Sequence, residues 1–108
     1  TNNEFDYNTN IGSVKSFYEV DSSEFNNLSY LQSLEVIYLE KFNNIKDLNF
    51  LASLNNLKCI KIRDCLNLSS IDSIKELPLL EELLLINCPK IINTIGFGSQ
   101  VCVTLIKK

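Results

Sequence analysis

The sequence predicts an α/β solenoid, a short array of coils whose strands form one parallel sheet and whose returns are helical. Three observations carry this prediction. Apolar residues recur with an offset of 23 residues, from Leu31 to Leu54 and again to Leu77. Each coil holds two aliphatic residues separated by one residue, and apolar residues at three-residue spacing follow them. A single coil cannot bury its own apolar residues, so the coils must stack and share one core.

The period divides the chain into segments. We expect an N-terminal cap or disordered segment at 1–13 and a repeat domain at 14–108. Within that domain we expect an atypical coil at 14–30, three repeats at 31–53, 54–76 and 77–99, and a C-terminal cap strand at 100–108. Gly96 and Gly98 break the pattern before that strand and predict a turn.

The paired aliphatic residues predict the register of the strands. Side chains two residues apart on a strand point to the same face, so both members of each pair should face the core. The pairs are Ile37 and Leu39, Ile60 and Ile62, and Leu83 and Leu85. The three-residue spacing that follows them does not fit a strand and suits a helical or 3₁₀ return on the convex side.

The two ends of the array are less regular. A last strand from Val101 to Ile106 would turn Val103 and Leu105 inward, only 20 residues after the preceding pair. A first strand lies within 14–20, and its register is open. Either Phe17 faces the core, or Tyr18 and Val20 do.

Two stretches carry a resemblance to a known superfamily. NIKDL at 44–48 with LNNLK at 54–58 resembles the repeats of bacterial internalins. LPLLEEL at 77–83 with NCPKI at 87–91 is similar to the cysteine-containing repeats of immune receptors and F-box proteins. Residues 28–95 therefore resemble the leucine-rich repeat superfamily. The resemblance implies a concave strand face that binds proteins.

Composition excludes several classes of function. The net charge is −3 and the 10 Lys and Arg residues form no basic run, which argues against nucleic acid as a partner. The chain has no His, the commonest general base. No apolar stretch approaches the ~18 residues of a membrane span. The chain starts at Thr1 and contains no Met, as expected of a fragment or a processed product.

The four cysteines do not form a metal or catalytic pattern. Cys65 and Cys88 occupy equivalent positions in consecutive repeats, which predicts a buried ladder of thiols rather than a disulfide or a zinc site. Cys59 and Cys102 fall on the opposite strand face, too far apart for a disulfide. We therefore expect four reduced thiols, a pattern that favours a reducing compartment and otherwise leaves the localisation open.

Cys59 is the one candidate nucleophile. Lys58 and Lys61 flank it and should favour its thiolate, but acyl transfer needs a base and His is absent. We therefore predict no catalytic, cofactor-binding or metal-binding residue.

The strand residues that alternate with the core pairs form the predicted binding site on the concave face. They should line up in rows across the strands, with Glu40 beside Arg63. Leu84 and Ile86 are apolar where water is expected, which indicates an interface with a partner or with the C-terminal cap. The nine residues predicted to bind a partner are Val36, Tyr38, Glu40, Cys59, Lys61, Arg63, Glu82, Leu84 and Ile86.

The sequence thus predicts a non-catalytic protein–protein interaction module. The alternative is a substrate-recognition or targeting domain cut from a larger enzyme or signalling protein. Self-association through the apolar end coil stays open.

Overall fold

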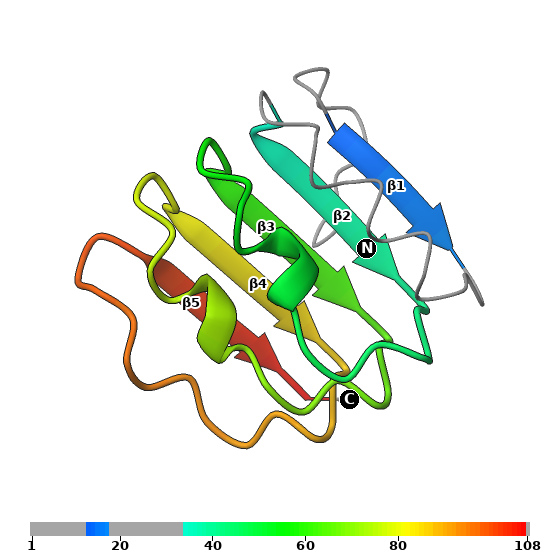
Figure 1. The fold of residues 1–108 in the computed structure, drawn as a ribbon. Helices are drawn as coiled ribbons and strands as arrows, with labels where there is room; N and C mark the ends of the chain where they lie inside the picture. Colours follow the sequence, from blue (N-terminus) through cyan, green and yellow to red (C-terminus); the bar gives the residue numbers. More distant parts are fainter. Residues whose placement is uncertain (1–12, 18–33, 108) are drawn as a thin grey trace.

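The computed structural model describes residues 13–17 and 34–107. Within these residues one parallel sheet holds five strands in chain order: β1 (Ser13–Phe17), β2 (Val36–Glu40), β3 (Cys59–Arg63), β4 (Glu82–Ile86) and β5 (Cys102–Ile106). The return segments lie on one side of this sheet, in front of it in Figure 1. The described part of the chain is therefore a small solenoid of stacked coils.

The offset of 23 residues sets the register of the first four strands. Ser13 pairs with Val36, Val36 with Cys59, and Cys59 with Glu82. The next step is shorter, because Glu82 pairs with Cys102. Val103 and Leu105 therefore align with Leu83 and Leu85, which confirms the predicted short final coil.

A continuous apolar core lies between the sheet and the returns. The three predicted pairs of aliphatic residues, on β2, β3 and β4, are fully buried in it. Leu48, Leu51 and their equivalents Ile71 and Ile74 close the core from the return side. The predicted inward face of the strands is thus confirmed.

The returns are tighter than the predicted α/β class implies. Each of the first two described returns contains one 3₁₀ turn, η2 (Asn49–Leu51) and η3 (Asp72–Ile74), and no α-helix occurs among residues 13–17 and 34–107. The reason is the three-residue spacing of the apolar residues, which matches the three residues per turn of a 3₁₀ helix. A parallel β-solenoid with short 3₁₀ returns is the description that the structure supports.

Each described return contains a hydrogen bond from a backbone N–H to a side-chain oxygen two residues earlier. Asp47 Oδ1 accepts a hydrogen bond from Asn49 N at 3.0 Å, Ser70 Oγ from Asp72 N at 3.4 Å, and Asn93 Oδ1 from Ile95 N at 3.2 Å. These short polar side chains fix a local turn. In the third coil the turn runs into Gly96, whose φ of 99° ends the regular pattern, as the predicted glycine break requires.

The first strand begins one residue earlier than expected and settles a register that the sequence left open. Val14 pairs with Ile37 and Ser16 with Leu39, whereas Phe17 pairs with Glu40. Phe17 therefore belongs to the row of Glu40 and not to the row of core residues. Tyr18 and Val20 lie outside the described residues, as do the rest of the segment 18–33 and residues 1–12 of the cap expected at 1–13.

Candidate binding face

The face of the sheet opposite the core is here named the outer sheet face. Its rows follow from the register: Val36, Cys59 and Glu82 form one row, and Glu40, Arg63 and Ile86 form another. Tyr38, Lys61 and Leu84 form the row between them. The structure thus brings all nine predicted residues together on one face, with Glu40 beside Arg63.

Three of the nine residues are not accessible, which corrects the expectation of a solvent-exposed face. Tyr38 is 1% exposed, Leu84 7% and Ile86 0%, and they form a second apolar cluster with Val36 and Ile106 packed against it. Strand alternation decides which face a side chain takes but not whether water reaches it. The Lys61 ammonium, 5.4 Å from the centre of the Tyr38 ring, covers part of this cluster.

The accessible part of the outer sheet face is charged and polar. Lys61 and Arg63 on β3 are half-buried, and Glu82 on β4 is exposed. Val36, Glu40 and Cys59 are also half-buried. Cys102 and Thr104, which the predicted set omitted, are exposed on β5 and extend the face. Their place on this face follows from the predicted inward direction of Val103 and Leu105, with which they alternate.

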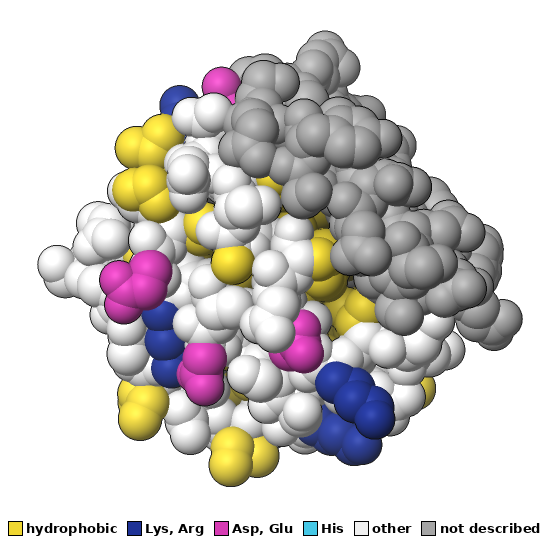
Figure 2. All heavy atoms as spheres, in the orientation of Figure 1, with side chains coloured by type: hydrophobic (Ala, Val, Ile, Leu, Met, Phe, Trp, Pro, Cys, Tyr) yellow, Lys and Arg dark blue, Asp and Glu magenta, His cyan; other side chains and the backbone are white. Residues whose placement is uncertain are grey.

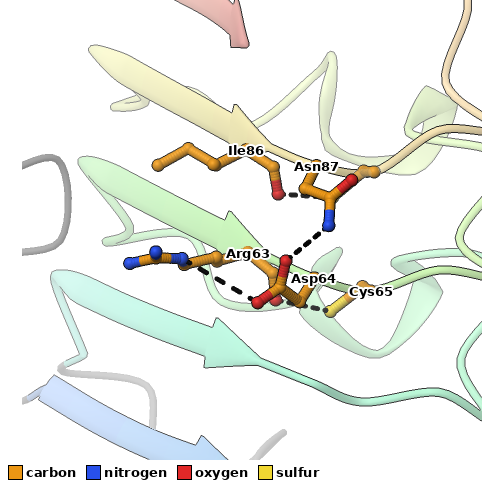
Figure 3. A network of polar contacts seen from close by, with 6 residues as sticks. Arg63, Asp64, Cys65, Ile86 and Asn87 are labelled. Atoms are coloured by element: carbon orange, nitrogen blue, oxygen red, sulfur yellow. Dashed lines mark hydrogen bonds and ion pairs between the residues drawn. The ribbon is translucent and has the colours of Figure 1, made fainter. Parts of the chain in front are cut away.

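A polar network joins the carboxyl ends of β3 and β4 (Figure 3). Asn87 Nδ2 donates to Asp64 Oδ1 at 2.7 Å, and Asp64 Oδ2 lies 3.9 Å from Arg63 Nε. Asp64 and Asn87 were absent from the predicted site. Their signal in the sequence is their place directly after a strand, where a short polar side chain tolerates the left-handed backbone.

The backbone repeats this junction at three strand ends. Lys41, Asp64 and Asn87 have φ values of 66°, 57° and 54°. Lys41 N donates to Arg63 O at 2.9 Å, Asp64 N to Ile86 O at 3.0 Å, and Asn87 N to Ile106 O at 2.9 Å. These hydrogen bonds tie the end of each of the three strands to the next strand, at the residue where the backbone becomes left-handed.

All four cysteines are free thiols. Cys65 Sγ donates to Arg63 O at 3.7 Å and Cys88 Sγ to Ile86 O at 3.6 Å, so each buried thiol bonds to a carbonyl of its own strand. Burial raises the pKa of Cys65 to about 12 and also raises the pKa of Cys88. These contacts support the predicted thiol ladder.

The environment of Cys59 opposes the thiolate that the flanking lysines were expected to favour. The pKa of Cys59 is raised from 9.0 to about 12, chiefly by burial and next by the adjacent Glu82 carboxylate, whose effect is larger than the opposing effect of Lys61. Cys59 Sγ donates to Glu82 Oε1 at 3.4 Å, a bond that holds the proton on sulfur. No group of three His, Cys, Asp or Glu residues arranged to hold a metal ion occurs in the described ranges.

A small hollow lies on the other side of the sheet, between the second and third returns. Its volume is about 190 Å³, and it is lined mainly by polar groups of 69–72 and by 91–93. Lys75 crosses it to reach Asp72 Oδ1 at 2.8 Å and lies over the Phe97 ring. The hollow therefore shares no residue with the outer sheet face.

Comparison with protein-family models, with curated proteins and with solved structures finds no match for the chain. No helix in the described part of the chain combines the length and hydrophobicity needed to cross a bilayer.

Proposed function

We propose that the chain is a short leucine-rich repeat domain that binds a protein partner through the outer sheet face and catalyses no reaction. The observation that supports this most strongly is the alignment of equivalent residues on successive strands. Tyr38, Lys61 and Leu84 occupy one row because β2, β3 and β4 pair without a change of register. An array of aligned rows on one sheet suits recognition of an extended protein surface.

The chemistry of the face also suits a protein partner. Lys61 and Arg63 place two cations two residues apart at the centre of the sheet, and the apolar cluster beneath them holds Lys61 in position through the Tyr38 ring. Arg and aromatic residues are enriched among interface residues that dominate affinity. Tyr38 itself is buried, so its part in binding is to position Lys61.

The absence of catalysis is proposed from the thiol chemistry. Cys59 is the nucleophile candidate that the sequence indicates, and its pKa of about 12 leaves it protonated at neutral pH. A protonated thiol without an adjacent base is a poor nucleophile.

The test is affinity capture with the intact chain, followed by calorimetric titration of the captured protein against variants. Lys61→Glu and Arg63→Glu should each weaken binding by about 1 kcal/mol or more. Lys46→Glu, an exposed charge reversal in the first described return, is the matched control and should leave the affinity unchanged. Normal binding by both β3 variants, with loss of binding by Lys46→Glu, would assign the site to the returns.

A further inference from the structure

Strand β5 ends the sheet and turns half of its backbone groups outward. Cys102 N donates to Glu81 O at 2.8 Å, and Ile106 O accepts from Asn87 N at 2.9 Å, so residues 102 and 106 direct their backbone groups toward β4. The direction of the backbone N–H and C=O groups alternates along a strand, so those of Thr104 also point toward β4. Those of Val103 and Leu105 point to the open edge. No described strand lies on that side.

This edge lacks the features that protect edge strands from pairing. The sequence of β5, CVTLI, contains no charged residue and no proline. Val103 and Leu105 are only half-buried, whereas their partners Leu83 and Leu85 on β4 are fully buried. One side of the core therefore ends in partly exposed aliphatic side chains.

The same coil is apolar on its outer surface as well. Ile92 is 79% exposed and Ile95 72%, whereas the equivalent residues one coil earlier are the polar Ser69 and Asp72. Figure 2 shows apolar side chains projecting at the lower margin, over the coil that leads to β5 in Figure 1. The coil before β5 therefore exposes large apolar side chains where the preceding coil exposes polar ones.

We infer that β5 binds β5 of a second copy in antiparallel orientation, about a twofold axis at Thr104. When Thr104 faces Thr104 of the second copy, the two β5 strands overlap over their full length. Val103 then pairs with Leu105 of the second copy. Both residues direct their backbone groups to the open edge, so they form the hydrogen-bonded pair that an antiparallel ladder requires. Cys102 then lies opposite Ile106 of the second copy in a non-hydrogen-bonded pair, and the two cores become continuous.

Charge favours a second copy as the occupant. The uncharged strand brings no like charges together at the axis. Lys107, whose Nζ donates to Ile91 O at 3.3 Å in its own coil, would lie beside Val101 of the second copy. Glu81 of that copy, whose carbonyl accepts from Cys102 N, lies one strand further on. Both charges are exposed, and the twofold axis creates this opposite-charge arrangement twice.

The first test is a cross-link that the proposed register allows and a single copy forbids. Within one strand residues 102 and 106 are about 13 Å apart, beyond the reach of a disulfide. Across a non-hydrogen-bonded pair the Cα atoms are about 4.5 Å apart. Mild oxidation of Ile106→Cys should give a covalent dimer in which mass spectrometry maps two disulfides, each joining Cys102 to the introduced thiol of the other copy. Lys107→Cys is the matched control and should not link to Cys102.

The second test measures association of the unmodified chain by sedimentation. Val103→Pro removes an N–H that points to the open edge and leaves the hydrogen bonds to β4 intact. It should raise the dimer dissociation constant by roughly tenfold or more without changing the circular dichroism spectrum, since each dimer loses two hydrogen bonds. Lys61 and Arg63 are untouched, so this result is independent of partner binding on the outer sheet face.

Three results would overturn the inference. The first is a chain that sediments as a monomer at all accessible concentrations. The second is a dimer whose disulfides map to other positions or that survives Val103→Pro. The third concerns hydrogen exchange at the Val103 and Leu105 amides. If these amides become protected only when an unrelated strand peptide is added, the occupant of the β5 edge is not a second copy.

Discussion

Asp64 shows how a single residue joins two coils. Its N–H donates to Ile86 O, its carboxylate accepts a hydrogen bond from Asn87, and its backbone is left-handed. A left-handed conformation costs an ordinary L-residue roughly 1–2 kcal/mol, and Asp and Asn tolerate it best. The residue after each strand is therefore chosen by backbone conformation and by its reach to the next coil.

Replacing Asp64 separates these two contributions. Asp64→Ala loses the side-chain acceptor and places a less tolerant residue at positive φ, so it should lower the free energy of unfolding by about 1–2 kcal/mol. Asp64→Asn keeps an oxygen acceptor and the conformational tolerance, so its loss should be less than half as large. Urea denaturation of the two variants measures both values. Equal losses would show that the junction does not depend on the side chain.

At the scale of the strand, the alternation of side chains separates core residues from outer residues. Ile60→Ala and Leu83→Ala should each cost about 2–5 kcal/mol, because they leave cavities in a fully buried core. Lys61→Ala should cost less than about 1 kcal/mol, since it removes a half-exposed contact with the Tyr38 ring. Thermal denaturation of the three variants checks this order. Equal losses of stability would mean that the assignment of side chains to the two sheet faces is wrong by one residue.

Leu84→Ala tests whether a side chain on the outer sheet face can be as buried as the structure shows. Alternation alone assigns Leu84 to solvent and predicts a negligible cost. Its burial in the second apolar cluster predicts a loss of more than about 1 kcal/mol. A loss no larger than that of Lys61→Ala would contradict the buried cluster.

The strands of the central coils were predictable because two independent periods agree there. The two-residue period of Ile37 and Leu39 fixes the inward face, and the 23-residue period repeats it in β3 and β4. In β1 the two-residue period gives no guide, because Ser16 occupies the position of a core leucine, and only the 23-residue period remains. Subtracting 23 from Val36 would have located its start at Ser13.

The sequence predicts which residues lie on the outer sheet face, but not which of them are accessible to solvent. Strand alternation places Tyr38, Leu84 and Ile86 on the outer sheet face. Their burial depends on how they pack against one another, which the periodicity of the sequence does not predict. The pKa of Cys59 was mispredicted for a similar reason. The neighbouring lysines are visible in the sequence, whereas the desolvation and the Glu82 contact that outweigh them arise from cross-strand pairing.

At the scale of the whole molecule, stability rests on contacts between neighbouring coils. The buried thiols make part of that stability dependent on pH. The unfolded chain releases thiol protons near pH 9, whereas folded Cys65 holds its proton to about pH 12. The folded state therefore binds more protons than the unfolded state between these values, and stability falls as pH rises through that window.

Substitution of the thiol ladder tests this linkage. The free energy of unfolding of the native chain should decrease between about pH 8 and pH 10. The double variant Cys65→Ala and Cys88→Ala should start less stable because of the lost packing, but it should lose less stability over the same interval. Chemical denaturation at each pH gives the two slopes. A steeper slope for the double variant would contradict the raised pKa values of the buried thiols.

The fold of the described residues rests on the stacking of coils with their strands in register. Long-range scalar couplings across hydrogen bonds, measured by nuclear magnetic resonance, test it most directly because they identify a donor and its acceptor together. We expect couplings from Lys41 N to the carbonyl of Arg63, from Asp64 N to that of Ile86, and from Asn87 N to that of Ile106. Couplings to carbonyls one or more residues away, or an antiparallel pattern between any two of these strands, would contradict it.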